Sequence, residues 1–455
     1  MPEPTLPMSP ARQGMYFDSQ LRQSADYHIA IELYTEHLSR SRLAQAVSAV
    51  MAEQPALRAS VARNESGPVY MIAESVEAPV RHHDLTGAEE NLDKIFHTAR
   101  HAPFQLNTAP LFRVVAARLP DGDRLLVVCH HLIADGQSVS ILTDRIIDLA
   151  RGTREITASR TDQGLFTHQN GQLSRPSPET LARRESFWSE NLPRHRIPQL
   201  DHWLLASPHE DAAREFRLTV PRDTAEAVRE TAQEAEVSEF TVYLAAFGAL
   251  LAHYAGEDQV SFASPFMDRP HLEMENSIGC FIRTLPVLID VSPGLRVRDL
   301  LERTRSEVMG LWRNLDFPVA RKLSGLSSAG LFDITFIHDA YPELPEGVRA
   351  ATHPDEVHFP GRLTVTIEQL GDNTNIVIWY KESALTAERA ARFAERLLVL
   401  IQQIPTHLDA PVTDLQPMSA SERSDLLAAS RATHYFDWDP TDLGTLFLDR
   451  TNADP

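Results

Sequence analysis

The composition is that of a globular protein longer than one ordinary domain. Its 455 residues are 43% hydrophobic and 23% charged, enough for two sizeable hydrophobic cores. The net charge of −20 argues against nucleic acid or an anionic membrane as the main partner, because phosphate groups would be repelled. No apolar run is long enough to span a bilayer and no signal-peptide pattern opens the chain, so we expect a cytoplasmic protein.

Helix and strand patterns alternate along the first half of the chain. They predict a helix begun by Ser9 and Pro10, a helix over Leu38–Ala52, a strand over Leu111–Arg118, a buried strand over Leu125–Val128 and a helix over Gln137–Ala150. The second of these should bury the face formed by Leu43, Ala46, Val47, Val50 and Met51.

A polar stretch at 151–178, with scattered Gly and Pro, predicts a crossover to a second half. In that half the sequence predicts helices over Leu181–Leu192, from Thr224 onwards, over Val242–Tyr254 and over Thr386–Ile404. The helix over Val242–Tyr254 should be capped by Ser238 and ended by Gly256. The predicted strands are Phe216–Val220, Gln259–Ala263, Leu331–Phe336, and a hairpin of Leu363–Leu370 with Ile376–Tyr380. A short helix over Ser419–Leu427 follows.

Two histidines come directly after the buried strand, and Asp135 and Gly136 follow them. His130 and His131 could form a core turn, contribute to a metal site, or supply an acid or base near neutral pH. We find no third metal ligand at a diagnostic spacing and predict no metal. Cys129 should point away from His130, because neighbouring strand residues face opposite sides, and it is interpreted as a core residue.

The string Cys129–Gly136, read as HHxxxDG, resembles the central motif of condensation domains of nonribosomal peptide synthetases, members of the chloramphenicol-acetyltransferase-like superfamily. Ser9–Phe17 is similar to the first motif of that family. Ser277–Pro286 is similar to the fifth, with agreement at Ile278, Gly279, Phe281, Ile282, Thr284 and Pro286. Arg283 departs from it, since the family usually has Asn there.

Weaker similarities run along the rest of the chain. They are Leu57-Arg58 of the second motif, Phe166–Gln169, the helix with Phe187-Trp188, Leu311–Pro318 and Leu331–Phe336. Residues 443–447 resemble the opening of an adenylation domain.

The resemblance implies an α/β fold with two chloramphenicol-acetyltransferase-like lobes in a V, and a tunnel at their seam. The expected divisions are an N-terminal lobe at 1–175, a C-terminal lobe with floor loop and latch at 176–410, and a linker with the start of an adenylation domain at 411–455.

The resemblance also implies site roles. His131 is expected to be catalytic and His130 structural, while Asp135 and Gly136 hold the turn. Arg58 and Arg283 are expected to support the site. Three arginines could pair with Asp135: Arg283, which is the most attractive candidate, Arg58 and Arg269. Gly279, Phe281, Thr284 and Ser138 are expected to line the substrate tunnel.

The implied reaction is amide formation between a donor acyl thioester and the amine of an aminoacyl thioester. No cofactor is expected to bind directly, because both substrates would ride on phosphopantetheine arms of carrier proteins. The donor would arrive in trans, from a carrier protein or an acyl-coenzyme A, and could be a starter acyl group. The acceptor carrier and adenylation domain would lie downstream.

Several alternatives remain. A plant-type coenzyme A acyltransferase usually carries an Asp-Phe-Gly-Trp-Gly motif, which we do not find. An epimerisation domain is disfavoured because it is not normally followed by the start of an adenylation domain. A heterocyclisation domain is disfavoured because it would have an Asp in the HHxxx part of the motif, which is intact here. A catalytically degenerate domain that recruits partners and an ester-forming acyltransferase also remain. If Arg283 faces the tunnel, it could bind a carboxylate or polar substrate, and Arg283→Ala should then alter turnover or acceptor preference.

Overall fold

The computed structural model describes residues 5–22, 27–65, 67–155, 177–198, 200, 203–204, 213–269, 274–315, 332–341, 346–350, 361–370 and 373–431. The chain divides into two compact units, Met1–Leu415 and Gln416–Pro455. Within the first unit, we call the described residues up to 155 the N-terminal half and those from 177 to 415 the C-terminal half. The expected boundary at 175 lies outside the described residues.

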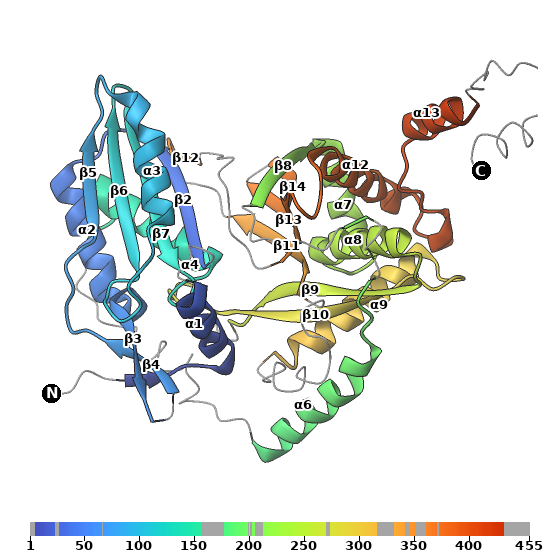
Figure 1. Ribbon diagram of the computed structural model, residues 1–455, viewed down its shortest axis with the longest axis horizontal. Coiled ribbons are helices and arrows are strands. Elements are labelled where there is room, and N and C mark those ends of the chain that lie inside the picture. Colours follow the sequence, from blue (N-terminus) through green and yellow to red (C-terminus); the bar gives the residue numbers. More distant parts are fainter. Residues whose placement is uncertain are drawn as a thin grey trace, which may run out of the picture. The chain divides into compact units, whose positions relative to one another are not determined.

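The N-terminal half is built on a mixed five-stranded sheet (Figure 1). Its strand order is β12 (Arg349–Ala350), β2 (His28–Thr35), β7 (Gly122–His130), β6 (Phe112–Leu119) and β5 (Val80–Asp84). The β5–β6 pair is parallel and the other pairs are antiparallel. β12 comes from the C-terminal half, which therefore contributes an edge strand to this sheet.

Helices cover both faces of this sheet, which explains why β7 is buried at every position. Leu125 and Val127 pack towards α2 (Arg40–Glu53) and α4 (Gly136–Arg151). Leu126 and Val128 pack on the opposite face against α3 (Leu92–His101). A strand buried on both faces reads as an unbroken apolar run, which is the pattern that the sequence shows here.

A small three-stranded sheet adjoins this half. Its order is β1 (Thr5–Pro7), β4 (Gly67–Ile72) and β3 (Ala59–Asn64), and α1 (Pro10–Arg22) follows β1. Short 3-10 turns η1 (Pro55–Arg58) and η2 (Glu89–Asn91) connect elements of this half. Pro10 stands at the first helical position of α1, as predicted.

The C-terminal half is built on a six-stranded mixed sheet. Its order is β10 (Ile282–Asp290), β9 (Gln259–Met267), β11 (Ile334–Tyr341), β13 (Leu363–Leu370), β14 (Asn373–Lys381) and β8 (Ala213–Val220). β11 runs parallel to both β9 and β13, while the remaining neighbours are antiparallel. The carboxyl ends of β9, β11 and β13 therefore lie at the same end of this sheet.

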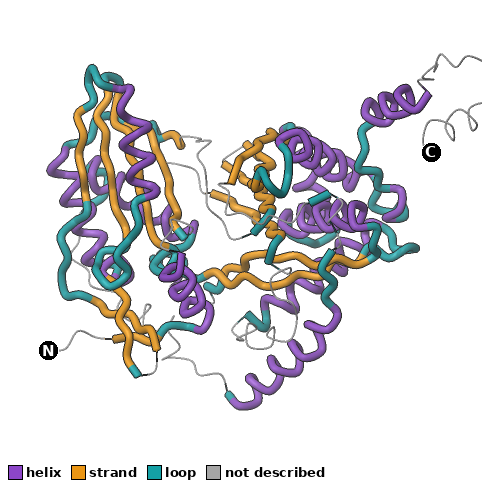
Figure 2. The backbone as a smooth tube through the Cα atoms, viewed as in Figure 1, coloured by secondary structure: helices purple, strands orange, loops and turns teal. Residues whose placement is uncertain are grey.

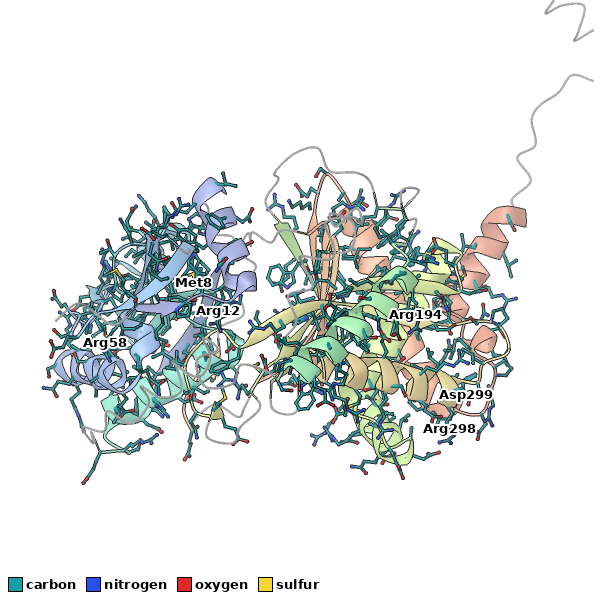
Figure 3. The ribbon with its side chains drawn as sticks, turned by 90° about the horizontal axis from the view of Figure 1, so that it is seen from below. Met8, Arg12, Arg58, Arg194, Arg298 and Asp299 are labelled. Atoms are coloured by element: carbon teal, nitrogen blue, oxygen red, sulfur yellow. The ribbon has the colours of Figure 1, made fainter. Side chains whose placement is uncertain are left out.

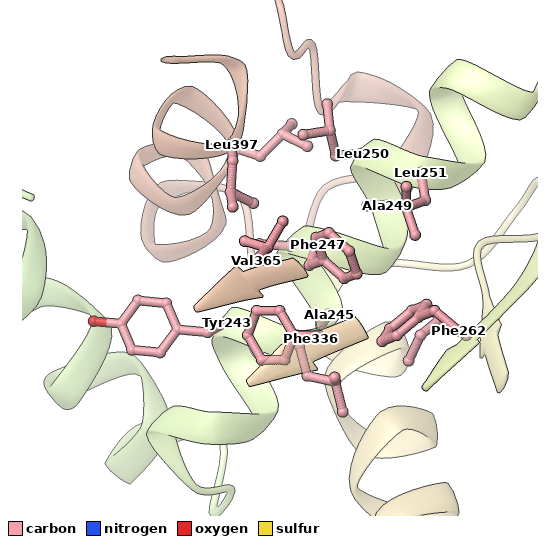
Figure 4. Packing of buried hydrophobic residues seen from close by; sticks show 14 of the residues in the cluster. Tyr243, Ala245, Phe247, Ala249, Leu250, Leu251, Phe262, Phe336, Val365 and Leu397 are labelled. Carbon is pink, nitrogen blue, oxygen red and sulfur yellow. The ribbon is translucent and has the colours of Figure 1, made fainter. Parts of the chain in front are cut away.

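One face of the six-stranded sheet carries the main core of this half. The covering helices are α7 (Arg222–Glu234), α8 (Glu239–Ala255), α9 (Val297–Trp312) and α12 (Ala387–Gln403) (Figure 2). Phe336 of β11, Val365 of β13 and Phe262 of β9 meet Phe247 of α8 and Leu397 of α12 in this core (Figure 4). These strand residues alternate with non-core neighbours, as the two-residue period of a strand requires.

The remaining described elements of the first unit are α6 (Pro178–Asn191) and the short turns η3 (Leu192–Arg194), η5 (Ile404–Thr406) and η6 (Val412–Asp414). The second unit contains α13 (Ala420–Arg431), in which Leu426 and Leu427 are exposed. Among the described residues no single helix could span a membrane, although the sharply bent pair α7 and α8 passes the same length and composition test.

Most predicted elements are confirmed. The predicted face of α2 is the buried one, Ser238 caps α8 by accepting from the Thr241 amide at 3.2 Å, and Gly256 ends α8 with φ +65°. β10 was missed: its first residues were interpreted only as a motif, and polar Arg283 and Thr284 obscure the alternation. The predictions at 166–169 and 316–318 lie outside the described residues.

Candidate active site

The two histidines lie where β7 gives way to a tight turn. The His130 amide donates to the Leu111 carbonyl at 2.9 Å, and the His131 amide donates to the Tyr27 carbonyl at 2.8 Å. The Ile133 amide then donates to the His130 carbonyl at 3.0 Å and closes the turn. The rigid sheet thus fixes the backbone of both residues.

His130 is an interior residue with a fixed tautomer. Its Nδ1 accepts from the Leu132 amide at 3.1 Å, so the proton belongs on Nε2, which lies 3.4 Å from the Ser19 hydroxyl. Burial, with help from His28 and His131, lowers the pKa of His130 to about 3. The structure therefore gives His130 a neutral, structural position.

His131 keeps part of its side chain exposed, while its Nδ1 is buried and receives no hydrogen bond from the described residues. Burial lowers the pKa of His131 to about 4, although the Asp135 charge and the Ala134 backbone act in the opposite direction. The imidazole is therefore neutral at physiological pH and able to accept a proton. Nε2 is the nitrogen left to meet a substrate.

Asp135 is completely buried and acts as the N-cap of α4. One carboxylate oxygen accepts from the Ser138 amide at 2.8 Å and from the Ser138 hydroxyl at 2.6 Å. The other accepts from the Phe281 amide at 2.8 Å, and the Asp135 amide donates to the Gly279 carbonyl at 3.1 Å. Asp135 thus joins the histidine turn to a segment that is more than 140 residues away in sequence.

Arg269 is the partner of Asp135. Its Nη2 lies 3.2 Å from the carboxylate, its side chain is 5% exposed, and it donates to the Met274 and Ser277 carbonyls at 2.6 and 2.8 Å. Its guanidinium also lies 3.9 Å from the centre of the Phe281 ring. Of the three candidate arginines, the geometry thus selects Arg269.

The preference for Arg283 as that partner is wrong. Arg283 instead forms an ion pair with Asp268 at 3.7 Å, because β10 turns its side chain to the face shared with Phe266. Arg58 is buried and donates to the backbone carbonyls of Met51 at 2.9 Å and of Ala73. Arg58 therefore holds backbone segments of the N-terminal half together.

Ser138 is fully buried, and its hydroxyl lies between Asp135, the Gly279 carbonyl at 2.7 Å and Arg269 Nη2 at 2.9 Å. The structure gives it a bridging position rather than a tunnel-lining one. Phe281 and Gly279 are likewise buried, whereas Thr284 is exposed. Gly136 has no positive φ, and an added Cβ would meet nothing within 4 Å, so the surrounding protein does not demand glycine there.

Arg12 of α1 is a site neighbour that sequence reasoning missed. Arg12, labelled in Figure 3, is buried. It donates to the carbonyl of Cys280, the residue before Phe281, whose amide Asp135 binds. Tyr70 lies against Arg12 and donates to the Leu132 carbonyl at 2.7 Å. The only available signal was the place of Arg12 in the opening motif.

Cys129 lies in the α2–α4 core, opposite His130, as the strand alternation predicted. Burial raises its pKa to about 12, so the thiol stays protonated and is no nucleophile.

Two mixed β-sheets, each covered by helices and joined through this histidine turn, define the chloramphenicol-acetyltransferase-like fold class. The chain belongs to the condensation domain family, whose model matches residues 3–427. Tyrocidine synthase 3 of Brevibacillus parabrevis is 26% identical over 95% of this chain, which spans 7% of that relative.

Solved structures show the same fold. The first condensation domain of the calcium-dependent antibiotic synthetase, in complex with a substrate analogue, aligns with a TM-score of 0.75 and 17% identity. The alignment covers 91% of this chain and 99% of that one. The epimerisation domain of the third module of tyrocidine synthetase B aligns with a TM-score of 0.74 and 17% identity over 89% of this chain and 97% of that one. The fold class is therefore confirmed.

Proposed function

We propose that this domain forms an amide bond between a donor acyl thioester and the amine of an aminoacyl thioester. The observation that carries the proposal is the histidine turn: His131 is neutral and partly exposed, and the buried ion pair of Asp135 with Arg269 holds the turn in place. Membership of the condensation domain family supports the same reaction class.

The chemistry asks little of the protein beyond placement and proton transfer. The neutral amine attacks the thioester carbon, a C–N bond forms, and the adduct carries a positive nitrogen and a negative oxygen. His131 Nε2 accepts the nitrogen proton, the carbonyl re-forms, and the C–S bond breaks. The released thiolate takes that proton from His131 and leaves as a thiol. Bringing the two thioesters together replaces an entropy cost that free reactants would bear.

Asp135 takes no part in proton transfer in this proposal. Both of its oxygens already accept hydrogen bonds from Ser138, Phe281 and Arg269, and it has no exposed surface. Its role is to keep the turn and the loop before β10 in register, so that His131 does not drift from the reacting atoms.

The partners follow from the same reaction. We infer that both acyl groups arrive on phosphopantetheine arms of carrier proteins, that the protein binds no cofactor itself, and that it works in the cytoplasm. The acceptor carrier and an adenylation domain would belong to the same synthetase. The donor, which could be a starter acyl group, would come from a separate carrier protein or from acyl-coenzyme A.

A direct assay tests the proposal. The domain is incubated with its adenylation–carrier partner loaded with amino acid, acyl-carrier and acyl-coenzyme A donors are offered in turn, and the amide product is detected by mass. His131→Ala should lower product formation at least 100-fold, because general acid–base catalysis contributes typically ~10²–10⁴-fold. The control is His97→Ala, at an exposed histidine of α3.

Two results would overturn this assignment. Undiminished product with His131→Ala, in a variant with an unchanged circular dichroism spectrum, would remove the chemistry from His131. No product from the native domain with any donor, together with retained carrier binding, would favour the partner-recruiting alternative.

A further inference from the structure

A second histidine occupies a constrained position in the C-terminal half. His338 lies on β11, and its ring is half-buried. Its Nε2 lies 3.0 Å from Oε1 of Gln369, and Nε2 of Gln369 donates to a Glu239 carboxylate oxygen at 3.0 Å. Arg229 faces the other oxygen of Glu239 at 3.5 Å.

This chain of hydrogen bonds fixes the tautomer of His338. A carboxylate only accepts, so Glu239 orients the Gln369 amide with its NH₂ group towards Glu239. The amide oxygen then faces His338, and Nε2 of the ring must carry the proton. Nδ1 is left as an acceptor, and no described residue donates to it.

Two aromatic rings pack against the His338 ring. The Phe240 ring is nearly parallel to it, at 9° and 6.1 Å between centroids, and the Tyr243 ring lies at 5.6 Å. Burial lowers the pKa of His338, although Gln369 and Glu239 act in the opposite direction. Figure 4 shows the Tyr243 side chain at the margin of the core, with its hydroxyl directed away from the cluster.

The position of His338 connects it to the histidine turn. It lies in the carboxyl-terminal part of β11. The strand as a whole contacts α4, the helix that Asp135 caps. At the same end of the sheet, Phe266 of β9 packs against Phe240 and pairs across the strands with Arg283 of β10. Two residues before Arg283, the Phe281 amide bonds Asp135.

We propose that His338 belongs to a substrate-reading subsite, in which Nδ1 accepts a hydrogen bond from a neutral O–H or N–H donor on the side chain of a thioester-borne substrate. The Phe240 and Tyr243 rings pack against the His338 ring and hold it in this orientation. The inference rests on the proposed function and deepens it by naming the substrate class. The same chemistry could belong to the donor acyl group or to the acceptor amino acid.

Binding of unreactive analogues tests this subsite without requiring catalysis. The probes are amide-linked pantetheine analogues in pairs that differ by one hydroxyl: seryl and alanyl for the acceptor, 3-hydroxybutyryl and butyryl for the donor. Dissociation constants are measured by calorimetry for the native domain and for His338→Phe, which keeps the flat ring and removes the acceptor.

The native domain should prefer the hydroxyl-bearing analogue in one of the two pairs by about tenfold, and that pair identifies the source of the substrate. His338→Phe should abolish that preference and leave affinity for the analogue without the hydroxyl within twofold. The ¹⁵N resonance of His338 Nδ1 in the native domain should move only with the preferred analogue, which provides a test if the variant fails to fold.

Three results would overturn the inference: no preference in either pair, a preference that survives His338→Phe, or equal weakening of all four analogues. The first and last would mean that the histidine serves packing only. If the native domain forms no amide product but keeps its preference between analogues, the proposed function is overturned and the subsite is not. The two failures are therefore distinguishable.

Discussion

The Asp135–Arg269 pair allows a quantitative prediction about what joins the histidine turn to the C-terminal half. Asp135→Ala removes the acceptor of four hydrogen bonds and leaves Arg269, only 5% exposed, without its carboxylate. Breaking a buried pair from one side costs about 3–5 kcal/mol. Loss of the N-cap alone costs about 1 kcal/mol and is part of the same change. We therefore expect about 4 kcal/mol of lost stability.

The measurement is urea unfolding, read as a change of the free energy of unfolding at constant m-value. Arg269→Met added to Asp135→Ala should recover about 2 kcal/mol, because the uncompensated buried charge is then gone. Glu226→Gln, at an exposed ion pair with Arg222 on α7, serves as control and should change stability by less than about 0.5 kcal/mol. A loss below about 1 kcal/mol for Asp135→Ala, with no coupling to Arg269→Met, would refute the reasoning.

Two further predictions concern stability. His130 and His195 are buried and their pKa values lie at about 3 and about 4, so below pH ~6.5 the unfolded chain binds protons that the folded chain does not. The free energy of unfolding should therefore fall from pH 7 to pH 5, by about 2 kcal/mol per histidine. The urea midpoint of His195→Gln should fall less steeply over this range than that of the native protein. An equal decline of the two midpoints would contradict this prediction. Gly248→Ala should lose about 1–3 kcal/mol in urea unfolding, because the added Cβ would lie 2.6 Å from Ile289. Gly14→Ala, whose Cβ meets nothing within 4 Å, should instead be neutral or stabilising.

Local patterns in the sequence were sufficient to predict many of the elements. The 3.6-residue spacing of Leu43, Val47 and Val50 identifies the buried face of α2, and the unbroken run Leu125–Val128 marks a strand covered on both sides. These features depend on neighbours within a few positions of the chain, which a periodicity can show.

Pairings across long sequence distances could not be read in this way. Arg269 and Asp135 are 134 residues apart, and Arg269 gives no local sign that it will meet a carboxylate. Arg283 attracted attention because it departs from a family motif, yet strand register, not motif position, decides where its side chain goes. The tautomer of His338 similarly depends on Gln369 and Glu239, which belong to two other elements.

The edge strand β12 has a consequence for how the protein can be divided. Arg349 and Ala350 pair with Tyr34 and Leu33, and so cover the outer side of β2 near its carboxyl end. The N-terminal half expressed alone would present the backbone groups of β2 at this end as an open template for pairing between molecules. Such edges promote aggregation, so the two halves cannot be exchanged between synthetases as independent pieces without first providing a substitute cover for β2.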